Sequence, residues 1–106
     1  MKIIKVQSKP YVLKLGINAL CRFEDMTGKT VEQIEDEFSI KTLRILFYCA
    51  LKGGGNKEID LEATGELMDD FIAEEGMDAL SDILGEVAEA SLGKQEARAE
   101  LESVLR

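Results

Sequence analysis

The chain has 106 residues, 45% of them hydrophobic, and its 13 basic and 21 acidic side chains give a formal net charge of −8. This length fits one domain, and the apolar fraction is too high for a chain that is disordered throughout. The sequence contains no histidine, which excludes Ser-His-Asp catalysis, Cys-His catalysis and His-based zinc sites. The excess of acid argues against nucleic acid and membrane surfaces as partners, because binding to either uses a basic patch.

The first 15 residues predict a β-hairpin. Two short extended runs, residues 3–6 and 11–15, flank the turn-prone segment 7–10. In the second run Tyr11, Leu13 and Leu15 share one face of the strand, so we expect this face to contact the core. A hairpin of this size is marginal alone, and its strands could pair within the chain or with a second copy.

After residue 16 the apolar spacing changes from two residues to about 3.6, which predicts helices. Ile17, Leu20 and Phe23 form the apolar stripe of a first short helix, and Gly28 fits a left-handed C-terminal cap. The capping box at residues 30–33 predicts a second short helix.

Ser39 can cap a third helix, which runs to Leu51 with apolar residues on almost every side. A helix of this kind belongs at the centre of the domain. Lys52 and the three glycines after it are expected to end the helix and to form a flexible loop.

Asp60 can cap a fourth helix that ends near Gly76, and a fifth helix follows from Met77 to Gly93. Residues 94–106 read as an amphipathic helix or tail. The sequence therefore predicts a mainly α single domain over residues 1–93, with about five to six helices in all and a short N-terminal β-hairpin.

The two cysteines, Cys21 and Cys49, lie in apolar periodic segments and do not form a C-x-x-C pair. We expect both to be reduced core residues of a cytosolic protein. No segment approaches 18 apolar residues, and the N-terminus lacks the apolar stretch of a signal peptide. A soluble protein that is not exported by that route is the expectation.

Two short motifs resemble ligand-binding loops. The glycines before Lys57 suggest a phosphate loop, but the preceding strand and the G-x-x-x-x-G-K-[ST] spacing are missing. The segment from Asp60 to Gly65 begins like an EF-hand loop, but its twelfth position is Phe71 instead of a bidentate Glu. A plain loop and a capped helix are the better interpretations.

Adjacent acids such as Asp69-Asp70 and Glu74-Glu75 could act as acid/base pairs or as metal ligands. Neighbouring helical residues point about 100° apart, so neither pair converges on one site. No nucleophile stands beside a plausible base either. We therefore expect a protein that is not an enzyme and that uses no cofactor and no metal.

Charge is segregated along the chain. Residues 1–22 hold five basic side chains and no acid, residues 41–57 hold four and no acid, and residues 58–90 hold twelve acids and no base. Such segregation suits head-to-tail self-association into a homo-oligomer that need not close. The candidate interaction surface comprises the basic residues Lys14, Arg22, Lys41 and Arg44 and the acidic residues Asp69, Asp70, Glu74 and Glu75.

The segment over residues 11–34 resembles the small tail assembly chaperones of long-tailed bacteriophages and prophages. Those proteins have a short strand, a helix of the form N-A-L-x-x-[FL]-E-x-x-T-G-K and a second short helix. The matching residues here are Asn18-Ala19-Leu20, Phe23-Glu24 and Thr27-Gly28-Lys29. The resemblance extends over residues 10–93, through an apolar helix, a glycine-bearing loop, an acidic helix and an Ala/Leu-rich helix.

The resemblance implies a protein of the host cytoplasm that coats the tape measure protein, helps to recruit tail tube subunits and is absent from the mature virion. Family members are often also made as a longer, frameshifted form. The family supplies no catalytic residues.

Two other classes of function stay open. A small acidic regulator could mimic nucleic acid and bind a basic protein partner. A calcium-responsive or other metal-responsive module is suggested by the segment from Asp60 to Gly65.

Overall fold

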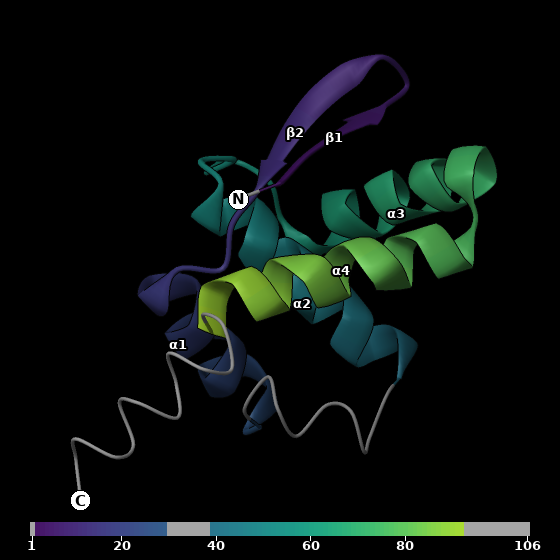
Figure 1. Cartoon of the computed structure of the whole chain (residues 1–106). Coiled ribbons are helices and arrows are strands. Elements are labelled where there is room, and N and C mark those ends of the chain that lie inside the picture. Colours follow the sequence, from purple (N-terminus) through teal and green to yellow (C-terminus); the bar gives the residue numbers. More distant parts are fainter. Residues whose placement is uncertain (1, 30–38, 93–106) are drawn as a thin grey trace, which may run out of the picture.

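The computed structural model describes residues 2–29 and 39–92, and confirms a mainly helical domain with a short N-terminal hairpin (Figure 1). The elements are β1 (Lys2–Val6), β2 (Lys9–Leu13), α1 (Ile17–Thr27), α2 (Ile40–Gly53), α3 (Leu61–Glu75) and α4 (Met77–Leu92). These four helices correspond to the first, third, fourth and fifth of the predicted helices. The predicted second helix and the predicted tail at residues 94–106 lie outside the described residues.

Helix α2 is the central element, as its apolar sequence predicts. It contacts α1, α3, α4 and β2. Ser39 caps it as expected, because the Ser39 hydroxyl oxygen accepts the N–H of Thr42 at 3.1 Å. Its buried side chains are Leu43, Ile45, Leu46, Phe47, Cys49, Ala50 and Leu51.

Helices α3 and α4 form an antiparallel pair that packs beside α2 (Figure 1). Asp60 caps α3, since its carboxylate accepts the N–H of Ala63 at 2.7 Å. Gly76 alone links the two helices, and its φ of 93° is a conformation that glycine adopts without strain. The buried residues of the pair are Thr64, Leu67, Met68, Phe71, Leu80, Leu84 and Val87.

The two strands pair with each other within the chain, antiparallel, with Val6 opposite Lys9. The turn is therefore only two residues long, and Gln7 and Ser8 both have positive φ, 50° and 68°. The predicted turn over residues 7–10 is too long, because Pro10 belongs to β2, where an edge strand tolerates proline.

The hairpin packs with its backbone directly against the end of α2. The N–H of Lys14 donates to the carbonyl of Ala50 at 3.0 Å. A Cβ on Gly53 would lie 2.0 Å from the Lys14 carbonyl oxygen, and one on Gly54 would lie 1.9 Å from that of Val12. Only glycine fits at these two positions.

The glycine segment differs from the predicted flexible loop. Helix α2 continues to Gly53, and the side-chain N–H of Asn56 donates to the carbonyls of Val12 and Leu51, at 3.2 and 2.9 Å. Glycines here allow a close approach of two backbones, which a turn-prone composition does not distinguish from an open loop.

Helix α1 contacts the core through Leu20 and Phe23 of its predicted stripe, but not through Ile17. Ala19 and Phe23 are buried, whereas Ile17 is 74% exposed and Cys21 is exposed. Ile17 and Cys21 each lie two positions before a buried residue, about 200° around the helix. The predictions that Ile17 faces the core and that Cys21 is a core residue are therefore wrong.

Two other predictions for cysteine and glycine are confirmed. Cys49 is buried in the core. Gly28 ends α1 in a left-handed conformation, with φ of 72°, and its N–H donates to the Glu24 carbonyl at 2.7 Å.

Candidate functional site

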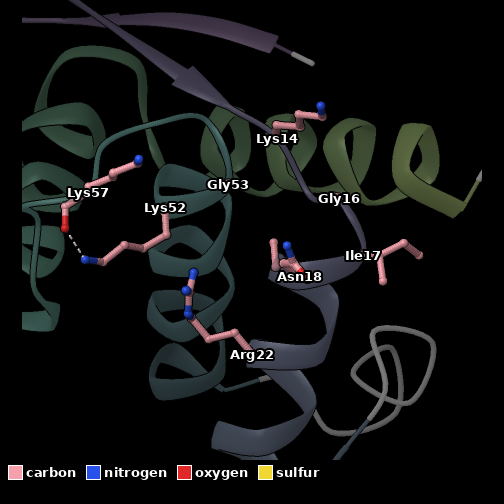
Figure 2. Close-up of a pocket in the computed structure, with 9 residues that line it drawn as sticks. Lys14, Gly16, Ile17, Asn18, Arg22, Lys52, Gly53 and Lys57 are labelled. Carbon is pink, nitrogen blue, oxygen red and sulfur yellow. Dashed lines mark hydrogen bonds between the residues drawn. The ribbon is translucent and has the colours of Figure 1, made fainter.

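A pocket of about 620 Å³ lies where the end of the hairpin, the start of α1 and the end of α2 meet (Figure 2). Among the residues that the structure describes, its lining contains four basic residues and no acidic one. The basic residues are Lys14, Arg22, Lys52 and Lys57.

The hairpin contact with α2 builds this pocket. The close approach of Gly53 to the Lys14 carbonyl holds the chain after β2 against the last turn of α2. The chain then turns at Gly16 into α1, which places Arg22 one helical turn beyond Asn18 on the same wall. Three segments that are distant in sequence therefore contribute cations to one hollow.

The Lys52 side chain is held in place at the pocket. Its ammonium group donates to the carbonyl of Lys57, and it also lies over the ring of Tyr48, 5.6 Å from the ring centroid (Figure 2). These contacts fix Lys52 without neutralising its charge.

The Arg22 guanidinium extends from α1 toward α2 (Figure 2). Burial raises the pKa of the Cys49 thiol to about 11, and the positive charge of Arg22 partly opposes this effect. The guanidinium is thus close enough to act on a core residue of α2.

No basic residue of the pocket has an acidic partner within residues 2–29 and 39–92. The ion pair in this part of the chain joins Lys2 and Glu86, at 3.0 Å, outside the pocket. The charge of the pocket is therefore left uncompensated by the described part of the protein.

The N-terminus of α1 opens into the same pocket. Gly16 is its N-cap and offers no side chain to the free backbone N–H groups, and the first turn contains no acid. Residues 16–19 all line the pocket, and the first bond within the helix runs from the Leu20 N–H to the Gly16 carbonyl at 2.9 Å. The helix dipole adds partial positive charge to that of the four cations.

A region of opposite charge lies on the second half of α3. Asp69, Glu74 and Glu75 are exposed and Asp70 is half-buried, and the last turn of α3 contains no basic residue. A helix C-terminus carries partial negative charge, so acids there raise the electrostatic energy. One of these acids has a contact within the chain, since the Glu74 carboxylate accepts the Gln7 N–H at 2.9 Å.

The structure brings together only half of the predicted basic surface. Lys14 and Arg22 share the pocket, whereas Lys41 is exposed in the first turn of α2. Lys41 precedes Lys52 by 11 residues on the same helix, which separates them by about 16 Å.

Arg44 lies between α2 and α3 instead of projecting freely. It is half-buried, with its Cδ 3.6 Å from where a Cβ on Gly65 would lie. Its Nε is buried and has no hydrogen-bond partner among the described residues. Much of this side chain therefore serves the packing of α2 on α3.

Sequence reasoning missed Lys52 and Lys57 as site residues. Both belong to the basic block over residues 41–57, which signals charge but not where each side chain points. Only the folded hairpin places Lys52 and Lys57 beside Lys14 and Arg22.

The segment that begins like a calcium loop forms the start of a helix. Asp60 is the N-cap of α3, and the Thr64 hydroxyl, which is fully buried, donates to the Asp60 carbonyl at 2.7 Å. Among residues 2–29 and 39–92, no cluster of three or more acids or cysteines could hold a metal ion. None of the described helices combines the length and the apolar character needed to cross a membrane.

Comparisons of the chain with protein-family models, with curated proteins and with solved structures find no match.

Proposed function

We propose that this protein is a non-enzymatic tail assembly chaperone of a long-tailed bacteriophage or prophage. It self-associates, binds the tape measure protein and helps to recruit tail tube subunits. It acts in the host cytoplasm and is absent from the mature virion. The sequence support is the resemblance centred on residues 18–29, and the structural support is one observation, the presence of two regions of opposite charge that have no salt bridges within residues 2–29 and 39–92.

The two charged regions have opposite signs, and each lies near a helix end whose partial charge has the same sign as the region. The basic pocket surrounds the positive end of α1, and the acidic region lies near the negative end of α3. Each region raises the electrostatic energy of a lone molecule, and contact with the opposite region of a second copy lowers it. This argument favours self-association.

A contact of this kind is head-to-tail, because it uses two different surfaces of the same molecule. Head-to-tail contacts produce rings when the rotation closes and open spirals when it does not. An open spiral can add copies along a long partner, which is the geometry needed to coat the tape measure protein.

The experiment is light scattering coupled to size-exclusion chromatography over a range of protein and salt concentrations. We expect the mean mass to rise with protein concentration and to fall with salt, because exposed charges are screened within about 10 Å at roughly 0.1 M salt. A tape measure segment mixed with the protein should elute with it.

Charge reversal identifies the surfaces. The pairs Lys14→Glu with Arg22→Glu and Asp69→Lys with Glu75→Lys should each weaken the oligomers, and a mixture of the two variants should partly restore them. The pair Lys5→Glu with Lys9→Glu changes charge by the same amount on exposed hairpin positions and is the matched control. A strict monomer that captures no tape measure segment would contradict the proposal.

The second candidate is a small acidic regulator that binds a basic protein. The exposed acids Glu62, Glu66 and Asp69 favour it, since their spacing places them in one row along α3. A pull-down from host lysate separates the two candidates, because a regulator should retain a nuclease or repressor whereas the chaperone should retain tail proteins.

A further inference from the structure

We propose that the basic pocket binds the phosphate group of a small phosphorylated molecule. The inference rests on the cavity and its charges and does not depend on the self-association proposed above. The pocket is concave and has a volume of about 620 Å³, and the described residues that line it include four basic ones and no acidic one.

The first argument is electrostatic. Cations from three separate chain segments share one hollow, and none has an acidic partner within the described residues. Like charges that border the same hollow repel, and Lys52 is held at the wall of the pocket with its ammonium directed toward the Lys57 carbonyl (Figure 2). A bound anion with more than one negative charge removes this repulsion.

The second argument concerns the hydrogen-bond donors. The pocket offers the guanidinium of Arg22, the side-chain amide of Asn18 and the free backbone N–H groups at the start of α1 (Figure 2). Donors of these kinds are typical of phosphate sites. A phosphate monoester presents three acceptor oxygens and up to two charges, so it uses more of this set than a carboxylate, which presents two oxygens and one charge.

The size of the pocket indicates that the phosphate carries an organic group. Pockets for small molecules and cofactors have volumes of about 300–1,000 Å³, and this pocket falls within that range. Ile17 borders the pocket, and its side chain, which is 74% exposed and points away from Arg22 and Lys52 (Figure 2), supplies apolar surface at the rim. Phosphate would bind at the N-terminus of α1, and the rest of the ligand would lie against Ile17.

A nucleic acid fits the observations less well. Its backbone is bound by basic side chains spread along an extended surface, whereas these four basic residues border one hollow of a chain with net charge −8. The pocket is also unlike a phosphate loop. Gly53 and Gly54 face the backbone of the hairpin, and the helix that receives the phosphate is α1, which does not follow the glycines.

The test uses adenosine monophosphate, inorganic pyrophosphate and adenosine as probes at constant low ionic strength. Calorimetry measures affinity, and amide chemical shifts in NMR spectra give the location. We expect adenosine monophosphate and pyrophosphate to shift the amides of residues 16–19 and 52–57, with adenosine monophosphate bound more tightly. Adenosine should produce no such shifts.

Variants test whether the pocket is responsible. Arg22→Gln should weaken binding of adenosine monophosphate at least tenfold, and Lys57→Gln provides a second variant if Arg22→Gln does not fold. Lys41→Gln removes one positive charge outside the pocket and should leave the affinity unchanged. Native amide dispersion in all three spectra is the control for folding.

Three outcomes would overturn the inference. The first is the absence of shifts with either phosphate probe, and the second is equal weakening in Arg22→Gln and Lys41→Gln, which indicates net charge alone. The third is a set of pocket amides that shift with protein concentration but not with phosphate. That result assigns the pocket to contacts between copies and agrees with the proposed function. If instead the protein is a strict monomer that binds phosphate, the phosphate inference holds and the proposed function is wrong.

Discussion

Gly54 has an ordinary backbone conformation, with φ of −82°, and still has no space for a side chain. A Cβ there would lie 1.9 Å from the Val12 carbonyl oxygen. We expect Gly54→Ala to lower the free energy of unfolding by about 2–3 kcal/mol, because the hairpin must move away from α2. Urea denaturation followed by circular dichroism measures this change.

Gly85 is the matched control, because it lies within α4 with nothing within 4 Å of its added Cβ. Gly85→Ala should stabilise the protein by about 0.5–1 kcal/mol, through helix propensity alone. A similar loss of stability in both variants would show that the contact between Gly54 and Val12 is not the cause.

Cys49 makes the stability of the protein depend on pH in the alkaline range. Burial raises the pKa of its thiol from 9.0 to about 11, so the folded state holds this proton more tightly than the unfolded state. The resulting stabilisation, about 2–3 kcal/mol, is complete below pH 9 and is lost as the pH rises from 9 to 11.

Unfolding measured from pH 8 to pH 11 in the presence of a reductant tests this effect. Cys49→Ala should remove the extra loss of stability above pH 9. Cys21→Ala should retain it, because Cys21 is exposed. An unchanged slope in Cys49→Ala would assign the pH dependence to other groups.

At the scale of the element, α3 depends on its N-cap. The Asp60 carboxylate accepts the Ala63 N–H at 2.7 Å. Asp60→Ala should cost about 1 kcal/mol and should speed hydrogen exchange in the first turn of α3, whereas Asp60→Asn keeps an acceptor and should cost little. Exchange measured by NMR distinguishes the two variants.

The same pair of variants tests the calcium hypothesis. If the residues from Asp60 to Gly65 held calcium, the ion would raise the melting temperature of the wild type and would do so less in Asp60→Asn. If the segment only caps a helix, calcium leaves the melting temperature of both unchanged.

The elements that the sequence predicts well are those with local signals. Ser39 and Asp60 act as N-caps and Gly28 as a C-cap because these residues make their contacts within a few positions. The sequence does not predict the two-residue length of the hairpin turn, because Gln7 and Ser8 are not the Asn-Gly type that marks such a turn.

The orientation of α1 could not be predicted in the same way. Its apolar residues surround much of the helix, so both Ile17 and Ala19 fit a plausible buried stripe. Packing against α2 selects the face with Ala19 and Phe23. Tertiary contacts therefore decide which face of α1 is buried, because a helix this short has too few residues for its own sequence to decide it.

At the scale of the whole molecule, one of the charge blocks in the sequence forms one region in space and another does not. The acidic block over residues 58–90 forms α3 and α4 with the loop before them, as a contiguous segment should. The basic block over residues 41–57 is divided, because α2 carries Lys41 at one end and Lys52 at the other. The pocket combines Lys52 and Lys57 from this block with Lys14 and Arg22 from the basic block over residues 1–22. No local sequence pattern predicts this combination.

The contact between the hairpin and α2 also has a consequence for the order of folding. Asn56 and Val12 are 44 residues apart in the chain, and a two-stranded hairpin is marginal without a surface to pack on. Helices α3 and α4 are joined by Gly76 alone and can pair through short-range contacts, which form faster than long-range ones. Translation produces the hairpin before residues 50–56, which form its supporting surface. The two strands therefore become stable only after the end of α2 has been made.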